Sequence, residues 1–234
     1  MTAIGLFGAG GRMGQAIRAE AEARADATIV APDAGAAVLI DFTSPAAFDA
    51  QIDMAINAGV PIVIGTTGLS AGQHRAIDRA AASIAVLESA NMSLGVNLVV
   101  HLVRQAAARL GPDWDIEIAE MHHRHKVDAP SGTALLLGRV AAEGRGVDLD
   151  ANSERGRDGN AGPRGTGTIG FASLRGGSVA GEHQVIFATE GERVEIGHRA
   201  ESRAIFAKGA IAAALWLKDR PAGRYTMADV LGLS

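Results

Sequence analysis

The chain contains no cysteine among its 234 residues. Disulfides, thiolate metal sites and cysteine nucleophiles are therefore excluded, and the composition fits a reducing compartment. Aromatic residues are scarce, at 4% of the chain, and no apolar run approaches the roughly 20 residues that span a bilayer. Neither sign of charge dominates, because 22 Lys and Arg stand against 26 Asp and Glu. We therefore expect no nucleic-acid partner and no membrane partner.

The residues that are present are typical of a folded globular protein, with 47% hydrophobic and 21% charged residues. The length allows one large domain or two modest ones. The first residues run directly into the strand-like segment AIGLFGAG, without a basic and cleavable leader. We therefore expect a cytoplasmic protein.

Short apolar strands alternate with helices over the first 90 residues. The strands are expected at 3–7, 27–31, 36–42, 61–68 and 84–89, and the helices at 12–25, 45–57 and 70–82. Strands rich in Val, Ile and Leu that alternate with helices predict a parallel sheet with both faces covered. The fold class is therefore α/β, with a Rossmann-like doubly wound sheet.

The pattern changes after residue 93. We expect a helix at 94–110, a strand at 115–123, a helix at 131–143, a long mobile loop at 144–168, strands at 168–175, 181–189 and 192–200, and a helix at 203–218. Strands separated by short glycine turns predict a mixed or antiparallel sheet in a second α+β domain. We expect the first domain to comprise 1–93 and 204–234, and the second to comprise 94–203.

A glycine cluster occupies the first strand-to-helix turn. Its members are Gly8, Ala9, Gly10, Gly11, Arg12 and Met13, followed by Gly14. Glycines let the backbone approach a pyrophosphate, and a helix N-terminus supplies N–H donors and a positive dipole end. The cluster therefore predicts dinucleotide binding. The last glycine comes one residue late for a strict G-x-G-x-x-G motif, so an ordinary tight turn stays an alternative.

Three further strand ends carry candidate cofactor residues. Asp33 follows the second strand, where an acid would accept hydrogen bonds from the adenosine ribose and disfavour a 2′-phosphate. This favours NADH over NADPH, although Asp33 could equally be a turn residue after Pro32. The other two strand ends supply Gly65, Thr66 and Thr67, and Ala90, Asn91, Met92 and Ser93. Ligands bind outside the carboxyl ends of such strands, but each segment could also be an ordinary turn.

The segment HHRHKVDAPSGTA, residues 122–134, predicts an anion site. Its two leading histidines end a strand, Lys126 lies in the following loop, and Ser131, Gly132 and Thr133 begin a helix. A helix N-terminus beside cationic groups suits a carboxylate. A zinc site is the alternative, but adjacent histidines on a strand point to opposite faces and the lysine repels a cation. We therefore expect no metal.

These motifs resemble those of the 4-hydroxy-tetrahydrodipicolinate reductase (dihydrodipicolinate reductase) family. The segments EMHHRHKVDAPSGTA, GAGGRMG, IDFTSP, VIGTTG, SANMSLGVN and GTIGFASLRGG followed by GEH occur in the family's order, from the first strand to the last helix. The resemblance implies hydride transfer from NAD(P)H to ring C4 of a cyclic imine dicarboxylate with loss of water. The product would be tetrahydrodipicolinate, in lysine and diaminopimelate biosynthesis.

The resemblance also implies residue roles. His122 and Lys126 would form the acid-base pair. The dicarboxylate would bind to His123, Ser131, Gly132 and Thr133. The cofactor would bind to residues 8–13, Asp33, residues 65–67 and residues 90–93. The second domain would bind substrate and build a homotetramer through its sheet.

The chain departs from the family pattern in two places. Family members usually have several dozen more residues between the second strand and LIDFTSP, so we expect a helix and a strand to be missing from the edge of the first sheet. Met92 stands where phenylalanine is usual. Two other functions stay open: a non-catalytic NAD(H)-binding regulator, and another two-domain nicotinamide-dependent dehydrogenase. Arg155, Arg157 and Arg164 are interpreted as solvated loop charges, with closure over a dicarboxylate as the alternative.

Overall fold

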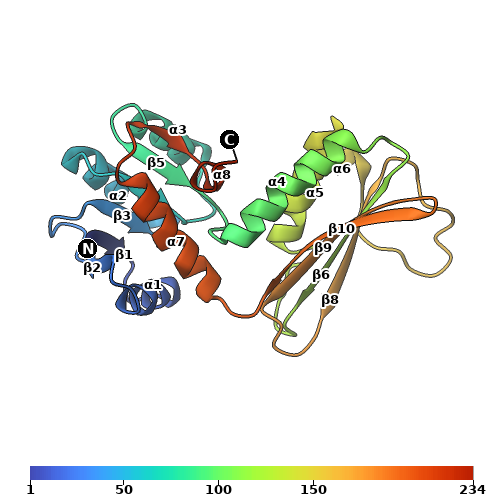
Figure 1. The fold of residues 1–234 in the computed structure, drawn as a ribbon, viewed down its shortest axis with the longest axis horizontal. Helices are drawn as coiled ribbons and strands as arrows, with labels where there is room; N and C mark the ends of the chain where they lie inside the picture. The colour runs from blue at the N-terminus through green and yellow to red at the C-terminus, as the bar shows by residue number, and fades with distance from the viewer. Residues whose placement is uncertain (234) are drawn as a thin grey trace. The chain divides into compact units, whose positions relative to one another are not determined.

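The computed structural model describes residues 1–233, and the chain divides into two compact units (Figure 1). Unit 1 comprises Met1–Leu94 together with the segment from Ala204 to the C-terminal end, and unit 2 comprises Gly95–Arg203. Each unit has a sheet and a hydrophobic core of its own. Among the described residues, no helix combines the length and apolar character needed to cross a membrane.

Unit 1 is built on a six-stranded parallel sheet in the order β11-β5-β4-β3-β1-β2. Its elements are β1 (Thr2–Phe7), α1 (Arg12–Glu22), β2 (Ala27–Val30), β3 (Val38–Asp41), α2 (Pro45–Ala58), β4 (Ile62–Ile64), α3 (Ala71–Ala80), β5 (Ala85–Glu88), α7 (Ala204–Leu217), β11 (Gly223–Tyr225) and α8 (Met227–Val230). The strand order reverses at β1, which pairs with β2 on one side and β3 on the other. Ligands bind at the carboxyl ends of the strands beside such a reversal.

Helices cover both faces of this sheet, as its continuous hydrophobic strands require. One core cluster joins the sheet to α1 and α7, and a second joins it to α2 and α3. The start of α2 follows local chemistry, because Pro45 occupies its first turn and Ser44 precedes it in extended conformation. Its end is set by Gly59, which has a left-handed φ of 64°.

Unit 2 is built on a mixed five-stranded sheet in the order β10-β9-β6-β8-β7. Its elements are α4 (Leu94–Arg109), β6 (Asp115–His122), α5 (Gly132–Arg145), α6 (Leu149–Asn152), β7 (Ser153–Glu154), β8 (Ile169–Arg175), β9 (Gly181–Thr189) and β10 (Glu192–Ala200). Strand β6 runs parallel to β8 and antiparallel to β9. Every second residue of β6 is buried, and Ile116 and Ile118 share a core cluster with residues of α4 and α5. The predicted fold class, a Rossmann-like sheet with a second mixed sheet, is confirmed.

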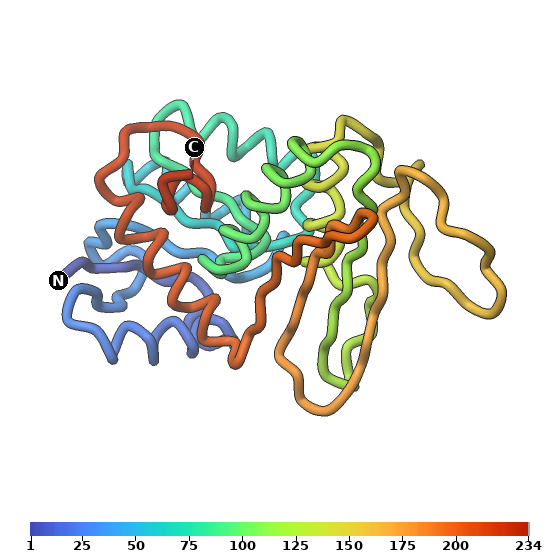
Figure 2. Tube along the Cα trace, turned by 45° about the vertical axis from the view of Figure 1, so that its right-hand side comes forward, coloured from blue at the N-terminus to red at the C-terminus, as the bar shows by residue number. Residues whose placement is uncertain are grey.

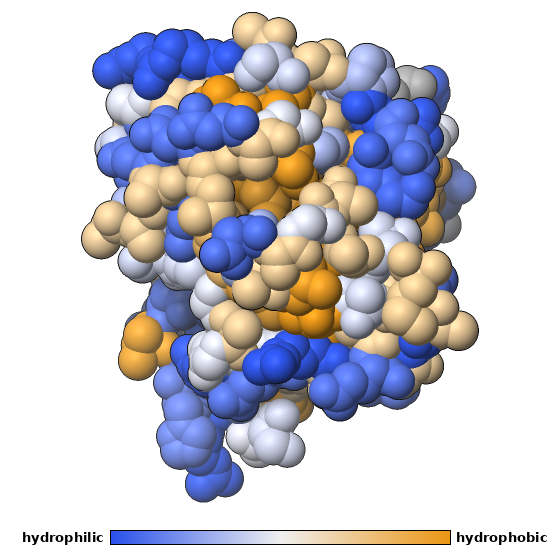
Figure 3. Space-filling view, turned by 90° about the vertical axis from the view of Figure 1, so that its left-hand side faces the viewer, coloured by the Kyte–Doolittle hydropathy of each residue, from blue (hydrophilic) through white to orange (hydrophobic). Residues whose placement is uncertain are grey.

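Two segments contain more structure than the sequence patterns predict. The segment after residue 218 holds β11 and α8, and the interpretation of 144–168 as one long loop is wrong at its beginning, where α6 and β7 form. The rest of that segment, 155–168, makes a long excursion between β7 and β8 (Figure 2). On the face shown in Figure 3, the most hydrophobic residues form small patches among residues of intermediate hydropathy, and hydrophilic residues form separate clusters.

Candidate functional site

The glycine cluster forms the turn between β1 and α1, beside the strand reversal. Gly8 has a positive φ of 73°, and Gly11 N donates a hydrogen bond to Gly8 O at 2.9 Å. Gly11 is the N-cap of α1, and no side chain in the described part of the molecule caps this helix. Gly8, Gly10, Gly11 and Arg12 are all exposed. The turn thus presents an uncapped helix N-terminus at the surface, which suits a phosphate group.

Gly14, which comes one residue late for a strict G-x-G-x-x-G motif, still has a packing role in the turn. It is buried in α1, and a Cβ at this position would lie 2.2 Å from Gly8 O and 2.7 Å from Ala9 Cα. These separations are far below van der Waals contact, so only glycine allows the first turn of α1 to pack against the strand end. This is the packing role of the last glycine in a dinucleotide fingerprint.

A buried carboxylate joins the neighbouring strand ends. Asp41, the last residue of β3, is 0% exposed. Its oxygens accept hydrogen bonds from Thr43 N at 2.9 Å, Thr43 Oγ1 at 2.7 Å and Thr66 Oγ1 at 3.0 Å. Gly8 lies beside this network, because a Cβ on it would be 2.9 Å from Thr43 Cγ2. Asp41 therefore holds the strand ends of the predicted cofactor site together, a role that the sequence interpretation missed.

Gly65 and Thr67 follow β4 and belong to the same predicted cofactor site. Gly65 N donates to Asp41 O at 2.8 Å, and a Cβ on Gly65 would lie 2.2 Å from the Phe42 ring. Thr67 is exposed, whereas Thr66 is buried against Asp41. The glycine therefore permits close packing here, while the exposed threonine is the member of this group that a ligand can reach.

The segment after β5 has a buried and an exposed part. Ala90 is exposed, and Ser93 N donates to Asn91 Oδ1 at 2.9 Å. Met92 is 1% exposed and belongs to the core cluster, and a Cβ on Gly209 would lie 1.7 Å from Met92 O. The Met92 side chain therefore packs the core of unit 1, and α7 passes directly against its backbone.

Asp33 lies in an exposed turn after β2. The turn is closed by a hydrogen bond from Ala34 N to Ala31 O at 3.0 Å. Within the described residues β2 is the edge strand, with no strand beyond it. The exposed carboxylate is compatible with either sequence interpretation, as a ribose acceptor or as a turn residue.

In unit 2, β6 brings Glu120 and His122 to one buried face. Glu120 is 2% exposed and His122 is 9% exposed. Nδ1 of His122 lies 2.6 Å from Oε2 of Glu120. An ionised carboxylate only accepts hydrogen bonds, so Nδ1 carries the proton in this pair. The other nitrogen, Nε2, would lie 3.0 Å from a Cβ on Gly181, and glycine leaves that space open.

Arg175, at the end of β8, forms a bidentate ion pair with Glu120. Its two terminal nitrogens donate to Oε2 and Oε1 of Glu120, each at 2.9 Å. Burial by itself raises the pKa of the Glu120 carboxyl, but hydrogen bonds from Arg175 and His122 outweigh burial and hold this pKa below its ordinary value. Glu120 is therefore an anion at neutral pH.

Ser131 connects the start of α5 to a second buried histidine. Its Oγ accepts a hydrogen bond from Ala134 N at 3.2 Å and lies 3.0 Å from Nε2 of His183. Burial, reinforced by the nearby His122, lowers the pKa of His183 to about 4. The His183 ring is therefore neutral at pH 7, and it meets the His122 ring edge-on with centroids 5.1 Å apart.

The loop between β6 and α5 carries Lys126 and His123. Lys126 N donates to His123 O at 3.1 Å, and Lys126 Nζ lies 2.8 Å from Asp128 Oδ1. The hydrogen bond from Lys126 lowers the pKa of the Asp128 carboxyl. Lys126 and His123 are both partly exposed. The loop that leads to α5 thus carries an ammonium group and an imidazole.

The tip of α5 is open. Gly132, its first residue, is exposed, and a Cβ placed there would meet nothing within 4 Å. Ser131, the N-cap, directs its hydroxyl to Ala134 and His183. An acceptor group from outside therefore has room at the helix N-terminus. Within residues 1–233, no group of three or more His, Asp or Glu side chains is arranged to hold a metal ion.

The loop arginines form ion pairs with acids; Arg155 and Arg157 are exposed, as their interpretation as solvated charges expects, whereas Arg164 is partly buried and that interpretation is wrong for it. Arg164 donates to Glu117 Oε1 and Asp115 Oδ1, each at 2.8 Å, and Arg157 donates to both oxygens of Glu117 at 3.1 and 2.8 Å. Arg155 donates to Asp150 at 3.3 Å. The pairs of Arg157 and Arg164 connect the segment 155–168 to β6.

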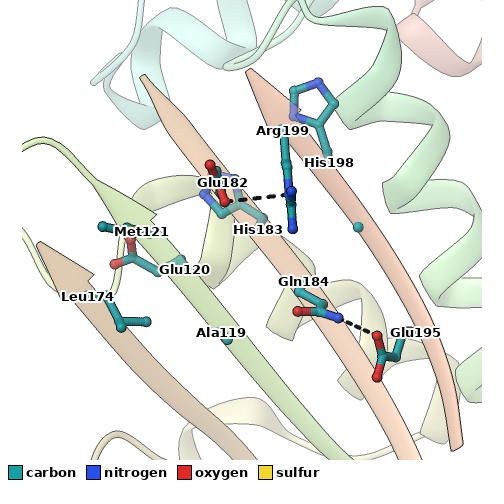
Figure 4. A pocket seen from close by; sticks show the side chains of 11 residues that line it. Ala119, Glu120, Met121, Leu174, Glu182, His183, Gln184, Glu195, His198 and Arg199 are labelled. Atoms are coloured by element: carbon teal, nitrogen blue, oxygen red, sulfur yellow. Dashed lines mark hydrogen bonds and ion pairs between the residues drawn. The ribbon is translucent and has the colours of Figure 1, made fainter. Parts of the chain in front are cut away.

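The face of the second sheet opposite α5 carries a hollow of about 500 Å³ (Figure 4). Two cross-strand pairs lie in it: Glu182 with Arg199 at 3.5 Å, and Gln184 with Glu195 at 2.6 Å. The rest of its lining includes Ala119, Met121, Leu174, Gly197 and His198. Glu120 and His183, which both contact Ser131, also line this hollow, whereas Lys126 and Gly132 do not.

Sequence patterns singled out the residues of the α5 tip but missed the groups that hold them. Glu120 lies inside the quoted motif, and its period-2 relation to His122 on the strand was the available signal. Arg175 is 55 residues away from Glu120 and reaches it only because β8 pairs with β6. His183 meets Ser131 through β9 in the same way.

Comparisons with known proteins agree with these motifs. A family model described as "Dihydrodipicolinate reductase, C-terminus" matches residues 95–231, and the corresponding N-terminal model matches residues 29–92. The chain is 56% identical to the 4-hydroxy-tetrahydrodipicolinate reductase of Zymomonas mobilis, covering 98% of this chain and 97% of the relative. It is 51% identical to that of Methylocella silvestris, covering 97% and 96%.

The second alignment extends over 261 positions, more than the 234 residues of this chain, so the Methylocella protein has residues without a counterpart here. Among solved structures, the dipicolinate-bound dihydrodipicolinate reductase from Paenisporosarcina sp. TG-14 has the same fold, with a TM-score of 0.80, 23% identity and 98% coverage of both chains. From its sequence relatives, the chain belongs to the dihydrodipicolinate reductase family.

Proposed function

We propose that the chain catalyses the reaction for which its relatives are named, the NAD(P)H-dependent reduction of 4-hydroxy-tetrahydrodipicolinate to tetrahydrodipicolinate in lysine and diaminopimelate biosynthesis. The sequence relatives carry this name at 51–56% identity over nearly the whole chain. The observation that carries the proposal for this chain is the open tip of α5, flanked by Lys126, His123 and the buried His122–Glu120 pair. Such a site suits an anion that must also receive a proton.

Unit 1 is proposed to bind the nicotinamide cofactor. The exposed turn at Gly8, Gly10 and Gly11, with the uncapped start of α1, fits a pyrophosphate. Residues 65–67 and 90–93 lie at the ends of the neighbouring strands and complete the proposed site. When bound, the reduced nicotinamide supplies the hydride.

The cofactor preference is proposed to be NADH. Asp33 is exposed at the end of β2 and is followed by Ala34 and Gly35, so this turn offers a carboxylate for a ribose and no cation for a 2′-phosphate. Arg12 is also exposed at the first turn of α1. For this reason NADPH is expected to be accepted as well, with lower preference.

Unit 2 is proposed to bind the dicarboxylate substrate. The backbone at Gly132 and Thr133 would bind one carboxylate at the helix N-terminus, where the dipole is positive. Ser131 shapes this turn by capping the helix, and His123 and Lys126 supply positive or donor groups from the preceding loop. A ring with two negative charges accounts for this concentration of donors.

His122 and Lys126 are proposed to transfer protons to and from the substrate. When hydride reaches C4 of the conjugated ring, the electron pair moves to the neighbouring carbon and nitrogen, and a proton must be added to balance the charge. His122 has Nδ1 fixed by Glu120, so Nε2 is available to exchange a proton with the substrate. Lys126 can supply a proton from its ammonium group. Such general acid contributions are typically about 10²–10⁴-fold in rate.

The chain is further proposed to act in the cytoplasm as a homotetramer assembled through the second sheet. The face of this sheet opposite α5 supports the assembly, because Leu174, which lines the hollow of Figure 4, is 52% exposed there. Exposed apolar residues on an uncovered sheet face are typical of subunit contacts.

The test is an absorbance assay of NADH oxidation with freshly generated 4-hydroxy-tetrahydrodipicolinate. The wild-type chain is expected to oxidise NADH rapidly, and His122→Gln and Lys126→Ala are each expected to reduce kcat by at least about 10²-fold, with NADH affinity retained. His125→Gln is the matched control, because it makes the same change at an exposed histidine of the same loop. NADH binding without turnover in the wild type would instead indicate a non-catalytic NAD(H)-binding protein.

A further inference from the structure

The carboxylate of Glu120 joins groups to which the proposed function gives separate tasks. Its Oε2 lies 2.6 Å from His122 Nδ1, and its Oε1 accepts a hydrogen bond from Ser131 N at 3.3 Å. His122 is the proposed proton donor, and Ser131 begins the helix whose tip would bind the substrate. Because Glu120 is 2% exposed, bulk water does not compete for these bonds. One side chain therefore orients both the imidazole and the helix start.

This contact decides which nitrogen of His122 can face a substrate. A charged carboxylate cannot donate, so the neutral imidazole carries its proton on Nδ1 and leaves Nε2 bare. Gly181 keeps the space beside Nε2 clear, since a Cβ there would approach to 3.0 Å. Gly181 also has a φ of 155°, which side chains rarely adopt. As a proton donor the ring is doubly protonated, and loss of its Nε2 proton to the substrate leaves the Nδ1-protonated tautomer that Glu120 stabilises. The other neutral tautomer would retain its Nε2 proton, because releasing it would leave an imidazolate.

Arg175 is what makes a charged Glu120 possible in this place. A buried carboxylate without a counter-ion would take up a proton, and it would repel a doubly negative ring bound nearby. Arg175 meets both oxygens of Glu120 at 2.9 Å and also donates to Asp128 O at 2.6 Å. The same guanidinium thus balances Glu120 and holds the loop that carries Lys126.

We propose that Glu120 is a positioning residue for the reduction, which selects the Nδ1-protonated tautomer of His122 and holds the first turn of α5, with Arg175 as its obligatory counter-ion. That this tautomer matters for catalysis rests on the proposed function. The tautomer itself follows from the contact between His122 and Glu120 and does not depend on that function. The other ring that faces His122 is His183, which is neutral and hydrogen bonded to Ser131, so it does not compete for the His122 proton.

The tautomer can be measured without any variant. In ¹⁵N-detected spectra of the imidazole side chains, recorded at a pH where His122 is neutral, the wild-type chain is expected to show a protonated Nδ1 and a bare Nε2. A protonated Nε2 in the wild type would overturn the proposal, even if every Glu120 variant failed to fold. Since this readout needs no substrate, it also separates failure of the inference from failure of the proposed reductase activity.

Kinetics of Glu120→Gln then test the consequence. The amide can donate to Nδ1, so the Nε2-protonated tautomer is expected to appear, and kcat is expected to fall on the order of 10²-fold. NADH affinity is expected to be retained. Glu117→Gln is the control, with the same change on the same strand but on the face that pairs with Arg157 and Arg164, and its kcat is expected to stay within twofold. An unchanged tautomer or an unchanged kcat in Glu120→Gln would overturn the proposal.

Discussion

The hydroxyl of Ser131 lies 3.0 Å from Nε2 of His183, although 52 residues separate them in the chain. Both side chains are buried, at 1% and 6% exposure. The pair connects the first turn of α5 with β9 and ties the predicted anion site to the sheet beneath it. Because burial lowers the pKa of His183 to about 4, this connection has a consequence for the pH dependence of folding.

The free energy of unfolding is expected to decrease as the pH falls from about 6.5 to 4. His183 titrates near 6.5 when unfolded and at about 4 when folded, so between these values only the unfolded state binds the proton. Each pH unit in this window costs about 1.4 kcal/mol of stability. Urea unfolding of wild type and His183→Gln at pH 7.5 and 5.0 measures this. The variant should lose about 2 kcal/mol less than the wild type does.

His125→Gln is the control for that experiment, because His125 is exposed and its removal should leave the pH dependence close to that of the wild type. If His183→Gln showed the same pH dependence as the wild type, His183 would not be buried in its neutral form.

Gly14→Ala is expected to destabilise unit 1 and to weaken cofactor binding. The added Cβ would lie 2.2 Å from Gly8 O, and backbone on both sides must move to relieve the contact. Overpacking of this kind costs about 1–3 kcal/mol, which chemical denaturation would reveal. Gly72→Ala is the matched control, since a Cβ there meets Ser70 Oγ at an ordinary 3.6 Å. Equal stability of the two variants would contradict the packing role of Gly14.

Arg164→Lys is expected to loosen the segment 155–168 without affecting substrate binding. Lysine keeps the charge but loses the planar group that reaches Glu117, Asp115 and backbone carbonyls. Trypsin should therefore cleave after Arg155 and Arg157 faster than in the wild type, while KM for the dicarboxylate should change less than about twofold. A rise in KM on the order of tenfold would favour the alternative, in which the arginine closes over the substrate.

Asp33→Ala is expected to shift the cofactor preference toward NADPH. The exposed carboxylate of Asp33 would repel a 2′-phosphate and bind a ribose hydroxyl, so its removal should raise KM for NADH and lower KM for NADPH, each several-fold. Relative turnover with the two cofactors measures the effect. Asp49→Ala makes the same change in net charge at an exposed position of α2, and it should leave the ratio unaltered.

Local chemistry was sufficient to predict the elements that carry the candidate residues. Pro45 after Ser44 marked the start of α2, and Ser131 before Gly132 marked the start of α5. The Val-, Ile- and Leu-rich strands of unit 1 are buried on both faces, as continuous apolar runs indicate. These signals are short-range, so a single sequence contains them.

The missed elements were too short to show a period. The strand β11 has three residues, Gly223–Tyr225, and it forms because its backbone pairs with β5 at the sheet edge. The strand β7 has two residues and forms against β8. Such strands depend on a partner that is distant in the sequence, which no local pattern contains.

The site residues that the sequence patterns did not predict were missed for the same reason, because their partners are distant in the sequence. Glu120 and Arg175 come together because β6 and β8 run parallel in a register that pairs Glu120 with Ser173. Asp41 meets Thr66 because β3 and β4 are neighbours. Sequence alone can identify a lysine, histidines and a helix start as suited to an anion, but the buried carboxylates that orient them are defined only by strand order.

The most direct test of the account is a crystal structure of the chain grown with dipicolinate, a stable dicarboxylate of the substrate's shape. The account predicts one carboxylate within hydrogen-bonding distance of the backbone N–H groups of Gly132 and Thr133, with Lys126 and His123 beside the ring. Dipicolinate bound at any other place, or no bound dipicolinate at a concentration that inhibits turnover, would contradict the assignment of the α5 tip as the substrate site.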